Sequence, residues 1–296
     1  ILYRGDLILS TMGRGFWVLD NITTLRDNAI TSLNDTPVLF QPDTTIRYRT
    51  PRRSKGFPDY PSTGVLIDYY LPKEGKNDVQ LEILDENKKS IATITSDSTM
   101  AKSTKEEVEN MGLSMSFTYY DTKLETKKGI NRFQWDMKQK GAWSDKPSRS
   151  YKNGPMVRSG SYTAKLTVEK ETFEQPFIIK VDPRLAKEGI DETIIANHIA
   201  FENKVLNLLT EARKFQSDLE TEIKKSRGER KQSLETILKT IKNDEGAYPQ
   251  QMLVPQIAYL SYIVGGSDKV PGNEEVERLK DLQQQLNMVK QEAQLN

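Results

Sequence analysis

Residues 160–184 decide the fold class, and they read GSYTAKLTVEKETFEQPFIIKVDPR. Up to Val181, apolar and polar side chains alternate with a period of about two residues, which predicts two β-strands joined by a turn. The sequence Asp182-Pro183-Arg184 breaks this pattern, and beyond it apolar residues recur at steps of four and three. That spacing predicts an amphipathic α-helix. The chain therefore divides into an N-terminal β region and a C-terminal helical region.

Four helices are expected after the break. The first has an apolar seam that runs from Ile194 to Leu219 and ends before Arg227-Gly228. Apolar residues at 234–241 mark a second helix, Pro249 begins a third, and residues 276–289 mark the last. Because the connections are short, we expect the helices to pack antiparallel as a small bundle.

Short strands at regular spacing precede the break. Residues 97–128 are polar and charged and form a long insertion, with one weak strand at 113–117. Regular short strands with polar turns predict a β-sandwich of immunoglobulin-like (Ig-like) type. The expected strands cover residues 64–71, 79–85, 90–96, 129–137, 160–168 and 173–181.

Two further apolar runs, Leu7–Ser10 and Phe16–Leu19, stand near the start of the chain. The glycine-containing turn between them predicts a β-hairpin. The sequence opens at Ile1 without Met and without the basic, apolar and small-residue pattern of a signal peptide. Removal of a signal peptide would explain this start. Because an isolated hairpin leaves strand edges unpaired, however, the expectation we favour is that the chain is a piece of a longer protein that supplies the missing partner strand.

Composition argues against several classes of function. The 296 residues predict about two domains. The chain has 43 Lys and Arg residues against 42 Asp and Glu residues, so its net charge gives no global attraction to nucleic acid.

The absence of cysteine excludes disulfides, thiolate catalysis and Cys-ligated metal. The only histidine, His198, argues against a multi-histidine metal site or a Ser-His-Asp triad. No apolar run reaches the roughly 20 residues that span a bilayer. We expect no cofactor, no metal, no nucleic acid and no membrane span.

No spacing singles out a catalytic pair of carboxylates. A glycosidase needs two acidic groups in one site, but each candidate is more simply a turn cap or the solvated end of a strand. His198 falls on the helical seam, which indicates a hydrogen-bonded interface histidine rather than a ligand or base. We therefore assign no catalytic residue. The carboxylates considered are Asp20, Asp59, Asp68, Asp136 and Asp145.

Three aromatic residues in polar loops, Tyr60, Trp143 and Tyr151, are the candidate glycan-binding residues. Exposed aromatic rings can stack on sugars, but loop aromatics also fold back to cover a sandwich core. Both interpretations remain open for these three residues. Trp135 lies beside Phe133 on an alternating strand and is expected in the core.

Several segments together resemble one known family. Residues 6–20, DLILSTMGRGFWVLD, look like the strand pair that closes the sortilin/Vps10-like BNR-repeat β-propellers. These are large secreted bacterial proteins that are often labelled glycosyl hydrolases. Met12 stands where that family usually has His. Residues 129–136, GINRFQWD, and 160–166, GSYTAKL, are similar to the FlgD-type Ig-like module that follows the propeller. The helical tail also resembles that family's C-terminus.

The resemblance implies three parts: a remnant propeller hairpin at 1–36, an Ig-like β-sandwich at 37–183 and a helical bundle at 184–296. It implies a periplasmic or secreted location and an upstream propeller as partner. No catalytic residue of the family maps onto this chain, so the expected role is a non-catalytic accessory region. Such a region supports or orients the propeller and docks a glycan or a protein.

Two alternatives remain open. In the first, the chain is part of a glycoside hydrolase whose catalytic site lies mainly on the propeller. In the second, it is a stand-alone carbohydrate-binding module with Trp143 and Tyr151 side by side on one exposed face.

Overall fold

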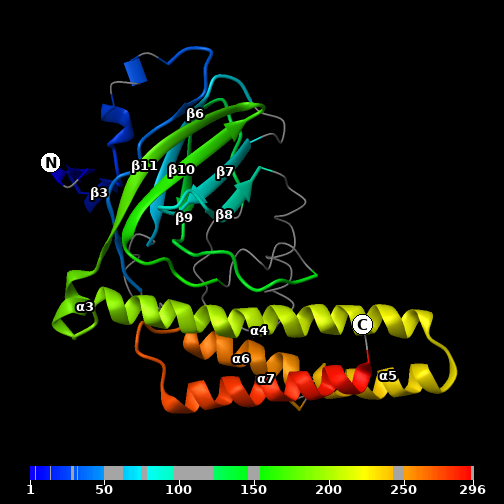
Figure 1. The fold of residues 1–296 in the computed structure, drawn as a ribbon. Coiled ribbons are helices and arrows are strands. Elements are labelled where there is room, and N and C mark those ends of the chain that lie inside the picture. Colours follow the sequence, from blue (N-terminus) through cyan, green and yellow to red (C-terminus); the bar gives the residue numbers. More distant parts are fainter. Residues whose placement is uncertain are drawn as a thin grey trace. The chain divides into compact units, whose positions relative to one another are not determined.

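The fold is described from a computed structural model. It describes residues 1–3, 5–13, 15–27, 30–31, 33–49, 63–74, 79–96, 123–145, 154–242 and 250–294. Contacts divide the chain into two compact units. The β unit comprises residues 1–137 and 159–181, and the helical unit comprises residues 138–158 and 182–296. The expected order, a β region followed by a bundle of four helices, is confirmed (Figure 1).

The described part of the β unit contains three sheets. The first is a hairpin sheet of β1 (Leu2–Tyr3), β2 (Asp6–Thr11) and β3 (Gly15–Leu19). The second has the order β4-β6-β9, with bounds Val38–Leu39, Val65–Leu71 and Gly129–Trp135. The third has the order β5-β11-β10-β7-β8, with bounds Thr45–Arg47, Glu171–Val181, Gly160–Val168, Val79–Leu84 and Ser90–Thr95.

The β4-β6-β9 sheet and the five-stranded sheet share one apolar core. The ring of Trp135 on β9 lies 6.3 Å from those of Tyr162 on β10 and Phe177 on β11, edge-on to both. Trp135 is therefore a core residue, as predicted. The alternation expected in β9 is also confirmed, since Ile130 and Arg132 are exposed on the opposite face. That outer face is the one next to the first hairpin.

The helical unit contains α3 (Pro183–Lys187), α4 (Glu192–Lys225), α5 (Gly228–Ile241), α6 (Leu253–Val264) and α7 (Asn273–Ala293). The side chain of Asp191 accepts a hydrogen bond from the Ile194 N–H at 2.8 Å, which caps the start of α4. Helix α6, which is the third of the four expected helices, begins at Leu253 rather than at Pro249. Pro255 then falls in its first turn, where a missing N–H costs no intrahelical hydrogen bond.

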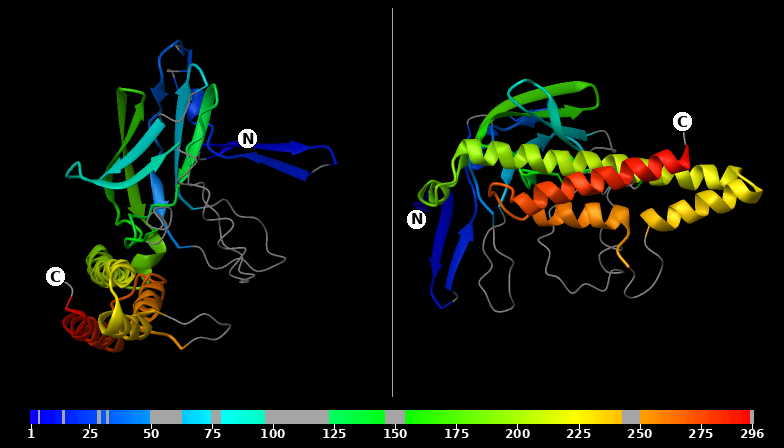
Figure 2. Two further views of the ribbon diagram at one scale, coloured as in Figure 1. Left: turned by 90° about the vertical axis from the view of Figure 1, so that its right-hand side faces the viewer. Right: turned by 60° about the horizontal axis from the view of Figure 1, so that its bottom comes forward.

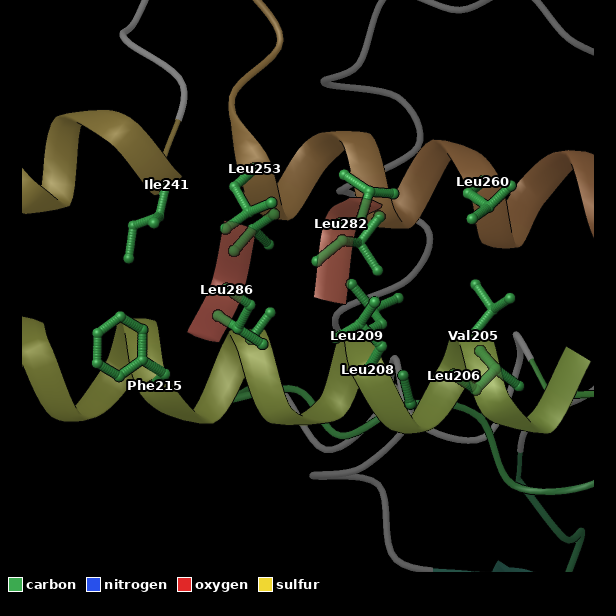
Figure 3. Packing of buried hydrophobic residues seen from close by; sticks show 14 of the residues in the cluster. Val205, Leu206, Leu208, Leu209, Phe215, Ile241, Leu253, Leu260, Leu282 and Leu286 are labelled. Atoms are coloured by element: carbon green, nitrogen blue, oxygen red, sulfur yellow. The ribbon is translucent and has the colours of Figure 1, made fainter. Parts of the chain in front are cut away.

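The bundle core runs along α4 and confirms the predicted seam. Figure 3 shows Val205 of α4 pointing toward Leu260 of α6, and Leu209 of α4 pointing toward Leu282 of α7. Ala142, from the connection between β9 and β10, belongs to the same buried cluster. The described residues of this connection, 138–145 and 154–158, therefore group with the helices, whereas the sequence-based division placed them within 37–183.

Candidate functional site

The hairpin of β2 and β3, here called the apolar hairpin, exposes large apolar side chains on both faces. The strand register pairs Leu9 with Trp17 and Ile8 with Val18. Because successive side chains on a strand point to opposite faces, Leu9 and Trp17 share one face while Phe16 and Val18 share the other. Their exposed fractions are 51%, 62%, 76% and 55%, respectively. Figure 2 shows this hairpin extending away from the other sheets of the β unit.

The apolar hairpin also leaves a backbone edge open. β3 is the last strand of the order β1-β2-β3 and pairs with no further strand in the described part of the chain. On the other side, β1 is aligned only with Asp6 and Leu7 of β2. An open edge is a template for pairing with another strand. The hairpin therefore offers two apolar faces and an unpaired edge to a second β-structure.

A polar network holds the root of the apolar hairpin on the β4-β6-β9 sheet. The Arg132 guanidinium on β9 donates from Nε and Nη2 to the two carboxylate oxygens of Asp68 on β6, at 2.7 and 2.8 Å. It also donates to the backbone carbonyls of Asp20 and Asn21, at 3.0 and 2.8 Å. Thr24 donates its hydroxyl to the buried Asp68 carboxylate at 2.6 Å. These bonds fix the chain where it leaves β3.

Charge pairing is strong at this root. The hydrogen bonds to Asp68 raise the pKa of the Arg132 guanidinium above its already high ordinary value. Arg132 therefore stays protonated throughout the physiological pH range. The Asp68 side chain is only 4% exposed, so its charge depends on Arg132 and Thr24 for compensation.

A small cavity of about 190 Å³ lies at the same root and is here called the root pocket. Leu19, Leu25 and Ile130 line it from three different elements, and Arg132 also contributes to its wall. These three apolar residues are 52%, 55% and 42% exposed. Leu19 also belongs to β3, so the root pocket continues the apolar surface of the hairpin.

The sequence did not reveal this network. Asp68 and Arg132 are 64 residues apart in the chain, and no motif spacing links them. They meet because β6 and β9 pair antiparallel in a register that places Asp68 directly opposite Arg132. Strand alternation could have placed Arg132 on the outer face, but it could not have supplied the partner.

Two of the five carboxylates considered, Asp20 and Asp68, come together at the hairpin root. Asp68 is fully engaged with Arg132 and Thr24, which makes it an anchor for the chain rather than a general acid or base. Asp136 lies just beyond the C-terminal end of β9, and Asp145 belongs to the helical unit. Asp59 lies outside the described residues.

Of the candidate glycan-binding residues, only Trp143 lies within the described part of the chain. Tyr60 and Tyr151 lie outside it. Trp143 is partly buried in the helical unit. Its backbone N–H donates to Thr210 Oγ1 at 3.0 Å, and its carbonyl accepts from Arg213 Nη1 at 3.3 Å, so α4 holds this segment. Sugar stacking on the Trp143 ring stays a prediction.

His198 is a hydrogen-bonded interface histidine, as predicted. Its side chain is 3% exposed, and Nδ1 lies 2.6 Å from the carbonyl oxygen of Lys269. Because a carbonyl only accepts, Nδ1 carries the proton of this bond. Nε2 lies 3.9 Å from Glu202 Oε2, one helical turn further along α4.

Two kinds of feature are not found in the described residues. No group of three or more His, Cys, Asp or Glu side chains there has a geometry that could hold a metal ion. None of the described helices is both long and apolar enough to cross a membrane.

Comparisons with known proteins give no family assignment for this chain. No protein-family model matches it, and no curated protein matches it either. The function proposed below therefore rests on the geometry of the apolar hairpin and on the motif resemblance.

Proposed function

We propose that this chain is a non-catalytic accessory region of a larger secreted β-propeller protein and that it supports or orients the propeller. In this proposal the apolar hairpin belongs to the last propeller blade. The two facing sheets of the β unit are an Ig-like β-sandwich, and the helical bundle follows. The location is periplasmic or secreted, in line with the resemblance.

The exposure of both faces of the apolar hairpin carries the proposal. A hairpin that lies on one surface needs only one apolar face. Propeller blades are arranged radially around a channel, so an internal sheet has a neighbouring blade on each of its faces. Leu9 and Trp17 then face one neighbour, while Phe16 and Val18 face the other. Burying each of these side chains stabilises the assembly by about 2 kcal/mol.

The first test is the intact mass of the native gene product, captured from its source cells with an antibody to this chain. We expect a mass well above 33.8 kDa, the mass of the present chain. A mass near that of the chain would contradict the proposal, because no propeller would then precede the hairpin.

A second test compares two equally exposed aromatic residues. Trp17 on the apolar hairpin and Tyr259 on α6 are 62% and 64% exposed in this chain. We expect Trp17→Ser and Tyr259→Ser both to leave the melting temperature of the isolated chain nearly unchanged. In the longer protein, only Trp17→Ser should lower it, because only Trp17 becomes buried. Equal effects of the two substitutions in the longer protein would contradict insertion of the hairpin.

Glycan docking is the second part of the proposed role, and Trp143 is its candidate in the described part of the chain. The unaltered chain is first applied to a glycan array to find the glycans that it binds. If sugars stack on the indole ring, Trp143→Ala abolishes binding to those glycans. Unchanged binding would remove Trp143 from the proposal. The hydrolase alternative predicts that the longer protein cleaves glycosides and that this chain alone does not.

A further inference from the structure

We propose that the root pocket receives one uncharged apolar side chain from the segment that covers the apolar hairpin. This inference rests on the proposed function, because it names what the partner of the hairpin contributes at its root. It also goes further, because it assigns a chemical class to the occupant and a fixed place to the contact.

The rim of the root pocket favours an apolar occupant. Leu19 on β3, Leu25 in the short 3₁₀ turn Thr24–Arg26 and Ile130 on β9 converge there from three elements. Each of these side chains is between 42% and 55% exposed. A single apolar group between them removes parts of all three from water at once. Leu19 lies on the same face of the hairpin as Leu9 and Trp17, so a segment that covers this face reaches the pocket.

The arginine in the wall does not make the root pocket an anion site. A guanidinium has five N–H donors, and Arg132 already makes four hydrogen bonds, two to Asp68 and two to the carbonyls of Asp20 and Asn21. The buried Asp68 carboxylate balances its charge, and Asp20 adds a second carboxylate to the lining. An incoming anion would have to displace these bonds and meet two carboxylates.

The size of the root pocket suits a side chain rather than a free metabolite. Its volume of about 190 Å³ is below the roughly 300–1,000 Å³ of typical small-molecule sites. Pockets that accept one anchor side chain are common at the energetic centre of protein interfaces. The Asp68–Arg132–Thr24 network holds the walls in place before the partner arrives, which lowers the entropic cost of binding.

Three probes that share an isobutyl group and differ in the charge of the head group test this inference. Isoamyl alcohol is neutral, isovalerate is anionic and isoamylamine is cationic at neutral pH. Each is titrated into this chain with labelled Ile and Leu methyl groups, and NMR shifts are followed. We expect the alcohol to shift the methyl signals of Ile130 and Leu25. Both charged probes should bind at least about tenfold more weakly, because binding would remove their charge from water, and the buried carboxylate at the site, Asp68, is already paired with Arg132. A stronger response to either charged probe, or no shift with any probe, would overturn the inference.

A matched pair of variants locates the binding. Ile130 on β9 and Ile178 on β11 are 42% and 47% exposed, and they lie on different sheets. We expect Ile130→Ser to abolish the response of Leu25 to isoamyl alcohol and Ile178→Ser to leave it unchanged. If Ile130→Ser left the response intact, the site would lie elsewhere and the inference would fall.

The two proposals fail separately. The probe titration uses this chain alone, whereas insertion of the hairpin is measured by Trp17→Ser in the longer protein. If the pocket binds isoamyl alcohol but Trp17→Ser leaves the melting temperature of the longer protein unchanged, the propeller assignment is wrong and the apolar site stands. If no probe shifts the methyl signals but Trp17→Ser lowers that melting temperature, only the present inference is wrong.

Discussion

Arg132 shows how one side chain can join two parts of a β unit. It pairs with Asp68 across two strands, and it also binds the backbone carbonyls that follow the apolar hairpin. Each donor and acceptor in this network forms hydrogen bonds that replace those it would otherwise make with water. Losing one partner therefore leaves a charge without full compensation, which costs more than the intact pair contributes.

Asp68→Asn tests this network. The substitution keeps the shape of the side chain but removes its charge, so we expect a loss of about 1–3 kcal/mol in the free energy of unfolding. Chemical denaturation measures this loss. Glu174→Gln is the control, because the Lys88–Glu174 pair is exposed to water at both ends and exposed pairs contribute little. Equal effects of both variants would show that the Asp68–Arg132 pair is only a surface contact.

Asp182 gives a prediction about pH. Its carboxylate caps α3 and accepts hydrogen bonds from Arg184, which lower the pKa of Asp182 below its ordinary value. A lowered folded-state pKa stabilises the protein above the unfolded pKa of about 3.9, and this stabilisation is lost as the pH falls through the folded value. We expect Arg184→Gln to raise the pKa of Asp182 in a carboxyl NMR titration. An unchanged titration curve would assign the shift to another cause.

At the scale of elements, the apolar hairpin and the long helix α4 differ in how far their apolar side chains are buried. α4 buries its apolar seam against α5, α6 and α7, and eleven of its residues are buried. The apolar hairpin is no less hydrophobic, yet every described residue of β3 is exposed. The difference lies in the partners, because within the described residues only α4 has elements that cover its apolar side.

We expect the isolated chain to self-associate through the apolar hairpin at high concentration. Exposed apolar faces next to an open strand edge favour pairing with a second copy. Sedimentation velocity over a range of concentrations measures this association. Trp17→Lys should abolish it, while Tyr259→Lys, at an equally exposed aromatic residue of α6, should not. A chain that stays monomeric throughout would contradict this prediction.

At the scale of the whole molecule, the helical unit is built from two separate stretches of sequence. Residues 138–158 come from between β9 and β10, and Ala142 enters the bundle core. The two ends of this stretch meet at a bridge between Lys138 and Met156. Next to that bridge, a Cβ atom on Gly154 would lie 2.0 Å from the Gln139 carbonyl oxygen.

Gly154→Ala tests whether this close approach matters for stability. Because a backbone carbonyl cannot move aside easily, we expect a loss of about 1–3 kcal/mol in the free energy of unfolding. Gly272→Ala is the matched control, since its nearest neighbour would lie at an ordinary contact distance of 3.7 Å. Thermal unfolding followed by circular dichroism measures both. A neutral Gly154→Ala would show that the backbone next to the Lys138–Met156 bridge adjusts without cost.

The sequence by itself determined that a β region precedes a bundle of four helices, and it determined the hairpin, the face of β9 that carries Trp135 and the seam of α4. These features follow from local periodicity, because side-chain direction repeats every two residues in a strand and about every 3.6 in a helix. Only the tertiary structure decided which strands pair, that Asp68 meets Arg132, and that Ala142 belongs to the bundle. Those outcomes depend on contacts between residues far apart in the chain, and local periodicity carries no information about such partners.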